Sequence, residues 1–238
     1  MKKLFFAFFA LVALSASAQN DGTFNEPNAQ KRTVNGSFAA IEVSDGIDLY
    51  LSQGNEESVA VSAADEKYLP YFKTEVVNGT LKLYYDRSGL YRMADRKKLK
   101  AWVSFKTLEK LHGSAGSEVT VKGSLELEKL DMKFTSGSEF NGKLTAKELV
   151  VTQNSGAEIN MSGSTGKIRL DLSSGAEFNG YDLSVDYCDA EASSGAQVHI
   201  RINKELNARA SSGGGIKYKG EGLIRDINIS SGGLVKRA

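Results

Sequence analysis

The chain has 238 residues, of which 41% are hydrophobic and 25% charged, and its formal net charge is +1. These values are ordinary for a globular protein and give no electrostatic reason to expect a nucleic-acid partner. One cysteine excludes an internal disulfide and a Cys-based zinc or iron–sulfur site, and two histidines leave little for a His-based metal centre. We therefore expect no cofactor.

Residues 1–18 are typical of a secretory signal peptide. Two lysines precede an apolar run over residues 4–14, and Ala16-Ser17-Ala18 supplies the small residues of a cleavage site. The run is shorter than the ~20 residues that a membrane span needs, and the absence of a following cysteine excludes a lipoprotein. We expect export to the periplasm or the outer cell surface, with no membrane span in the mature chain.

The next two segments are a lead-in and a small β-region. Residues 19–33 are polar and predict a flexible lead-in, and residues 34–109 predict an N-terminal β-region. Within it the alternation of apolar residues predicts strands over 38–43, 58–62 and 99–105, a helical turn over 66–71, a hairpin over 72–85 and a loop over 86–98. The hairpin turns at Asn78-Gly79, a pair typical of tight β-turns.

Residues 110–238 contain a sequence repeat. A Ser-Gly-small-acid-apolar motif occurs seven times and becomes less regular toward the C-terminus, and its glycines are spaced by 18–21 residues. These glycines are Gly116, Gly137, Gly156, Gly175, Gly195, Gly213 and Gly232. Apolar residues stand five positions before and three positions after each glycine, so two short strands of about four to six residues meet at a bend. The glycine has either a positive φ or a close neighbour in the next rung.

A coil of stacked strands fits this repeat. Helical repeats do not tolerate Gly-Ser corners, no six-residue sub-period is present, and a calcium-binding roll would need an aspartate that the phrase lacks. We predict an all-β protein: a right-handed, single-stranded parallel β-helix of about seven rungs, after the smaller N-terminal β-region. An earlier phrase, Ser44-Asp45-Gly46-Ile47-Asp48, has the same pattern and predicts that the repeat begins at Gly46.

Three features together resemble one protein family. They are Phe38-x-x-Ile41-x-Val43-x-x-Gly46-Ile47-Asp48-Leu49-Tyr50-Leu51-x-Gln53-Gly54, then Leu81-x-Leu83 after Asn78-Gly79, and the later Ser-Gly-Ala-Glu rungs. The chain is similar over residues 34–235 to the "putative auto-transporter adhesin, head GIN domain" family of Bacteroidetes-type bacteria, although Gly46-Ile47-Asp48 replaces Gly-Ile-Asn. The resemblance implies an exported, β-rich protein with a role in surface adhesion, and it supplies no catalytic residues.

Four carboxylates recur at one position of the repeat, two residues after the corner glycine. They are Glu118, Glu139, Glu158 and Glu177, and stacked rungs would place them ~4.8 Å apart. Because such charges repel, the ladder calls for cations, of which calcium suits oxygen ligands, or for hydrogen-bond donors. The alternative, which we favour, is that these side chains face solvent and accept hydrogen bonds from the corner serines.

A second polar column stands two residues beyond the carboxylates. It comprises Asn141, Asn160 and Asn179, with Thr120 and His199 in the flanking rungs. Side-chain amides at rung spacing can hydrogen-bond along the coil, so we expect a structural ladder. The single thiol, Cys188, is expected to be a small buried hydrophobic group.

The N-terminal β-region offers a candidate ligand-binding segment. Tyr84, Tyr85, Tyr91 and Arg92 lie at the end of one predicted strand and in the loop after it, close to a basic run over residues 96–100. Exposed aromatic rings beside hydrogen-bonding cations are typical of surfaces that bind sugars or peptides. Strand alternation, however, buries either Tyr84 or Tyr85 in the core.

These features favour a non-catalytic, exported cell-envelope protein: an adhesin or interaction module that binds glycan or protein. One alternative is a periplasmic protein with a structural or sensing role. A more remote one is a polysaccharide-active β-helix enzyme, but the acids recur once per rung, and no clustered acid pair with basic partners interrupts the pattern. The sequence leaves the oligomeric state open.

Overall fold

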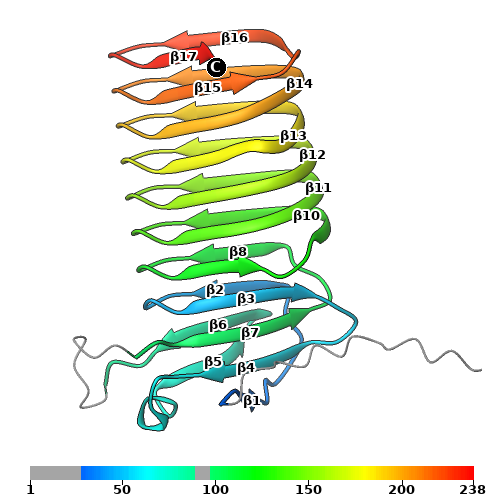
Figure 1. Cartoon of the computed structure of the whole chain (residues 1–238), viewed down its shortest axis with the longest axis vertical. Coiled ribbons are helices and arrows are strands. Elements are labelled where there is room, and N and C mark those ends of the chain that lie inside the picture. The colour runs from blue at the N-terminus through cyan, green and yellow to red at the C-terminus, as the bar shows by residue number, and fades with distance from the viewer. Residues whose placement is uncertain (1–27, 89–96) are drawn as a thin grey trace, which may run out of the picture.

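The computed structural model describes residues 28–88 and 97–238, which form a rod of stacked β-rungs (Figure 1). All the strands join in a single 17-stranded sheet that winds around one hydrophobic core. The predicted signal peptide, Tyr91 and Arg92 lie outside the described residues. No helix in the described part of the chain is long and apolar enough to cross a membrane.

The N-terminal part contains short strands and one helical turn. Its elements are β1 (Gln30–Arg32), β2 (Ala40–Val43), β3 (Asp48–Gln53), β4 (Ser58–Ser62), the 3₁₀ turn η1 (Glu66–Tyr68), β5 (Phe72–Val77), β6 (Thr80–Tyr85), β7 (Lys100–Phe105), β8 (Lys110–Gly113) and β9 (Glu118–Val121). The predicted hairpin is confirmed as β5 and β6, which pair antiparallel around Asn78-Gly79. Both turn residues have positive φ, which this tight turn requires.

The C-terminal part is a β-solenoid of about seven turns, which confirms the predicted coil of parallel strands. Its elements are β10 (Leu125–Phe134), β11 (Glu139–Gln153), β12 (Glu158–Leu172), β13 (Glu177–Ala192), β14 (Gln197–Ala210), β15 (Gly215–Lys219), β16 (Leu223–Ile229) and β17 (Leu234–Arg237). The right-handed sense of the coil stays a prediction.

The middle strands are longer than the four to six residues expected from the sequence. β11, β12 and β13 contain 15, 15 and 16 residues, because each continues without a break from one corner to the next. The Ser-Gly corner separates one strand from the next, whereas the other bend of each turn lies inside a strand, where the pairing of β13 with β12 and with β14 shifts register. Buried residues stack along the inside at equal register, as Leu149, Ile168 and Cys188 do in three successive rungs.

Cys188 is 3% exposed, as expected for a small hydrophobic group, and burial raises the pKa of its thiol far above the usual range.

Each corner depends on two consecutive residues with left-handed backbone. At the third corner Ser155 has φ +54° and Gly156 has φ +70°. A Cβ on Gly156 would meet no atom within 4 Å, so the glycine is needed for its conformation and not for close packing. The Gly156 amide donates to the carbonyl of Ser174 in the next corner over 3.1 Å, which ties the corners together along the rod.

The coil begins before residue 110, as the earlier Gly46 phrase predicted. Asp45 and Gly46 form a corner with φ values of 63° and 68°. β2 pairs parallel with β8, and β3 pairs parallel with β9, so this part of the N-terminal region is itself a rung of the same coil.

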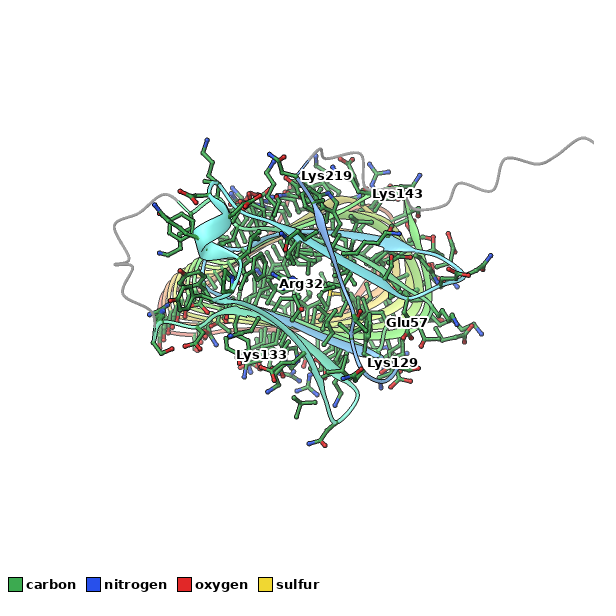
Figure 2. The ribbon with its side chains drawn as sticks, turned by 90° about the horizontal axis from the view of Figure 1, so that it is seen from below. Arg32, Glu57, Lys129, Lys133, Lys143 and Lys219 are labelled. Carbon is green, nitrogen blue, oxygen red and sulfur yellow. The ribbon has the colours of Figure 1, made fainter. Side chains whose placement is uncertain are left out.

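Antiparallel strands close the N-terminal end of the rod. β4 pairs antiparallel with β7 and with β1, and the Arg32 guanidinium donates to the Leu69 carbonyl over 2.9 Å. Figure 2, a view onto this end, places Arg32 over the middle of the cross-section. Strand β1 lies inside the segment expected to be a flexible lead-in; it is ordered by pairing with the edge of β4 that β7 leaves free.

Candidate functional site

The four ladder glutamates stack as the repeat predicted. Glu118, Glu139, Glu158 and Glu177 are register partners in successive rungs. The column begins one rung earlier at Asp48, whose partner is Glu118, and continues beyond Glu177 with the uncharged Gln197. Burial raises the pKa of Asp48, and the cation of neighbouring Lys100 partly opposes this shift.

Asparagines supply hydrogen-bond donors to this column, whereas we expected the corner serines to do so. Asn141 Nδ2 donates to Glu139 Oε1 over 2.7 Å, and Asn160 Nδ2 donates to Glu158 Oε1 over 3.0 Å. By contrast, the hydroxyl of the corner serine Ser136 is hydrogen-bonded to that of Thr135 over 3.1 Å. The Ser138 hydroxyl, just after the same corner glycine, donates inward to the Gly113 carbonyl. Glu139 and Glu158 are therefore held by amides two residues further along their own strands, whereas Glu118 accepts from the Thr120 hydroxyl over 3.5 Å.

The amides also form the predicted ladder along the rod. Asn160 donates to Asn141 and Asn179 donates to Asn160, each over 3.0 Å, and His199 Nδ1 lies 2.9 Å from Asn179 Oδ1. This column stabilises the stacking of rungs. Among residues 28–88 and 97–238, no group of three or more His, Cys, Asp or Glu side chains is arranged to hold a metal ion.

The structure separates the two tyrosines of the predicted binding segment. Tyr85 points into the core and is 6% exposed, with its ring 6.0 Å from that of Tyr71. Tyr84 points outward, and its hydroxyl donates to the Glu75 carboxylate on the neighbouring strand β5. Of the two, only Tyr84 is therefore positioned to meet a ligand, and Tyr91 and Arg92 lie outside the described residues.

Tyr84 lines a surface hollow with a volume of about 750 Å³. The hollow crosses five strands that lie side by side in the order β5, β6, β2, β8 and β10. Of its apolar lining residues, Val77 is exposed, whereas Leu83 and Val43 belong to the core beneath the hollow. Figure 2 shows Lys133, which lines this hollow, on the opposite side of the rod from Lys143 and Lys219.

A row of ionisable side chains crosses this hollow, one from each strand. Its members, as successive register partners, are Glu75, Lys82, Glu42, His112 and Lys133. Lys82 Nζ lies 3.4 Å from Glu42 Oε2, and His112 Nδ1 lies 3.9 Å from Glu42 Oε1. Desolvation lowers the pKa of His112, although Glu42 and Asp131 oppose this shift. The imidazole is therefore neutral at pH 7 and can donate and accept hydrogen bonds.

Sequence reasoning found Tyr84 but missed this row. Its members come from segments separated by up to 91 positions, Glu42 to Lys133, and each is an ordinary outward residue of an alternating strand. Only the parallel pairing of β2 with both β6 and β8 brings them together.

Comparison with solved structures shows the same fold in several bacterial proteins. A "putative adhesin" from Bacteroides fragilis superimposes with a TM-score of 0.80 and 18% identity over 88% of this chain and 96% of the other. A "putative adhesin" from Parabacteroides distasonis has a TM-score of 0.70 and 17% identity, over 89% of this chain and 96% of the other. A "putative lipid binding protein" from the same species has a TM-score of 0.63 and 18% identity, over 89% of this chain and 97% of the other. Among curated proteins, no match to this chain is found.

A comparison with protein families matches residues 37–222, from the strand before the first corner to the last rung but one. This confirms the resemblance that the sequence indicated, and none of the names of the similar structures is that of an enzyme. The chain belongs to the family described as "putative auto-transporter adhesin, head GIN domain".

Proposed function

We propose that this protein is a non-catalytic, exported cell-envelope adhesin that binds a glycan in the hollow between β5 and β10. The observation that carries the proposal is the row of alternating acidic and basic side chains beside the outward ring of Tyr84. Such a row presents many donors and acceptors with little net charge, which suits a hydroxyl-rich ligand, and an exposed aromatic ring can pack against the apolar face of a sugar.

The contacts within the hollow support binding over catalysis. Glycoside hydrolysis needs one carboxylic acid that donates a proton and a second that attacks or activates water. Here Glu75 accepts a hydrogen bond from Tyr84, and Glu42 pairs with Lys82. Both carboxylates already accept hydrogen bonds or ion pairs from side chains on a neighbouring strand. Neither is left free to donate a proton or to activate water. Release of reducing ends from a polysaccharide panel would contradict this part of the proposal.

The binding test compares two variants in the hollow with matched variants elsewhere. Tyr84→Ala removes the outward ring, and Tyr187→Ala removes an exposed ring on β13. Lys82→Ala breaks an ion pair of 3.4 Å in the hollow, and Lys129→Ala breaks one of 3.5 Å on β10. We expect each hollow variant to lose at least about fivefold in affinity, because hydrogen bonds and ring contacts are each worth about 1 kcal/mol or more.

The measurement is binding of the purified protein to immobilised glycans, followed by calorimetry on the best ligand. Protein ligands, including matrix proteins, form a second panel. Binding that Tyr84→Ala and Lys82→Ala leave unchanged would overturn the assignment of the hollow. Binding confined to the protein panel would replace glycan by protein as the ligand class.

Protease treatment of intact cells tests the location, with a known periplasmic protein as control. Cleavage of this protein while the control survives supports display on the outer surface and adhesion. Survival of both until the outer membrane is opened places the protein in the periplasm and excludes adhesion. The predicted signal peptide supports export in either case.

A further inference from the structure

The C-terminal end of the rod leaves its last rung uncovered. β16 and β17, at the end of the rod marked C in Figure 1, pair on one side only, with β14 and β15. Ile227 and Ile229 continue the inner columns of Ala208 and Ala210, yet they are 42% and 48% exposed because no further rung covers them. Leu223 and Leu234 on the same two strands are also exposed.

The opposite end of the rod is closed, so the two ends cannot stack on each other. There β1 and β4 cross antiparallel to the neighbouring strands, and Arg32 binds the Leu69 carbonyl above the core. Tyr68, Leu69 and Phe72 beneath this layer are buried. Head-to-tail association would therefore place the uncovered apolar rung of one copy against the covered N-terminal end of another, which offers no matching apolar surface.

The described chain enters and leaves its gaps far from the C-terminal end. β6 and β7, which flank residues 89–96 in the sequence, lie near the closed end. Once the predicted signal peptide is removed, residues 19–27 extend at most about 32 Å. The seven rung steps from β2 to β16 already span about 34 Å at ~4.8 Å each. We therefore look for the occupant in another molecule.

A second copy of the same end fits this surface. A free strand edge is complementary to another strand edge, and a two-fold axis perpendicular to the rod makes the two copies of each edge run antiparallel. Exposed isoleucines then meet isoleucines. The charges on these two strands balance. Arg225 pairs with Glu205 at 3.0 Å and Arg237 with Glu221 at 3.2 Å within each chain, and the other two charged residues, Asp226 and Lys236, have opposite signs.

We propose that two copies associate tail to tail through β16 and β17. The dimer is a rod of about twice the length, with a closed end and a hollow near each tip. If the hollow binds glycan as proposed above, the dimer is bivalent and can bridge two ligand-bearing surfaces. Failure of glycan binding would leave the dimer itself intact, so the two proposals are tested separately.

Sedimentation velocity between about 1 and 100 µM tests the association. Ile227→Asp places a charge on the uncovered rung, and Val77→Asp places one on a residue of similar exposure, 42% against 41%, in the β5–β6 hairpin. We expect a concentration-dependent dimer, a rise of at least tenfold in its dissociation constant for Ile227→Asp, and no change for Val77→Asp. Circular dichroism checks that both variants are folded.

Distance measurements on otherwise unchanged protein remain decisive even if Ile227→Asp misfolds. Spin labels at Lys236→Cys lie next to the proposed contact, and labels at Asn78→Cys lie in the hairpin turn near the closed end. Cys188 is buried and does not compete for the label. We expect a short distance between labels at 236 and none at 78. A monomer at 100 µM, a dimer unaffected by Ile227→Asp, or close labels at 78 would each overturn the proposal.

Discussion

Asn160 donates from Nδ2 to Oδ1 of Asn141 in the preceding rung over 3.0 Å. Asn160 Nδ2 also donates to Glu158 in its own strand, and Asn160 Oδ1 accepts from Asn179. One side chain thus ties three rungs together and holds a carboxylate. The column is a stabilising element of the rod.

Replacement of Asn160 by alanine should lower the free energy of unfolding by about 1–2 kcal/mol. The change removes the donor to Glu158 and leaves Asn179 without its acceptor, so partly buried polar groups lose partners. Chemical denaturation measures the effect. Asn55→Ala, at an exposed position of the β3–β4 loop, is the control and should change stability by less than about 0.5 kcal/mol. Equal effects at the two positions would contradict a stabilising ladder.

Replacement of Glu158 by glutamine should stabilise the protein by about 0.5–1 kcal/mol at low ionic strength. Glu158 lies between Glu139 and Glu177, and each pair at ~4.8 Å repels by about 0.9 kcal/mol in water. Glutamine keeps an acceptor oxygen for Asn160, as Gln197 shows that the column accepts an amide. The gain should vanish near 1 M salt, where the screening length is about 3 Å.

The control for this charge effect is Glu191→Gln. Glu191 lies between Asp171 and Arg209, so its repulsion and attraction nearly cancel and little change in stability is expected.

A glutamate column that binds calcium would behave in the opposite way. Glu158→Gln would destabilise the protein, and millimolar calcium would raise the melting temperature relative to chelator. We expect the same melting temperature in calcium and in chelator.

The glycines of the coil should separate into two classes on substitution by alanine. Gly156→Ala meets no atom, so its cost is the left-handed backbone alone, about 1 kcal/mol. Gly163 has φ +112°, and a Cβ there would lie 2.0 Å from the Leu144 carbonyl oxygen in the preceding rung. Gly163→Ala should therefore cost about 3 kcal/mol or more. Similar melting temperatures for the two variants would refute this division.

The repeat was predictable because each rung obeys the same local rules. Apolar alternation on both sides of Gly156, together with its 19-residue spacing to Gly175, indicates strands that meet at a corner and stack. Because every rung repeats the same pattern, equivalent residues of neighbouring rungs become register partners. The columns that contain Glu158 and Asn160 follow from this alignment. Their hydrogen bonds were harder to assign, because the amide and the corner hydroxyl lie at similar sequence distances from the carboxylate.

The hollow was not predictable, because its row depends on pairing between segments that share no repeat. Lys82 reaches Glu42 only because β6 leaves its hairpin and pairs parallel with β2. His112 joins them because β8 pairs with the other edge of β2. Alternation correctly indicated that one of two adjacent tyrosines is buried, but only the core around Tyr85 determines which one.

Stability should fall as the pH decreases from about 6.5, the ordinary pKa of histidine. Burial is the main cause that lowers the pKa of both histidines, His112 and His199, and the cation of Lys217 adds to the effect at His199. A lowered pKa in the folded state means that the unfolded chain binds more protons in this window, so acidification favours unfolding. Each histidine lowers the free energy of unfolding by at most about 1.4 kcal/mol per pH unit of acidification. This decrease levels off below the pKa of the histidine in the folded state.

The double variant His112→Gln, His199→Gln should flatten this dependence between about pH 7 and 5, because the chain has only two histidines. Glutamine at 199 can still donate to Asn179 Oδ1, so the ladder is preserved while the titration is removed. Unfolding free energies at several pH values give the slopes, and the NMR shifts of the imidazole protons give each pKa. An unchanged slope, or a pKa at or above 6.5 for both residues, would contradict the assignment of acid sensitivity to these two side chains.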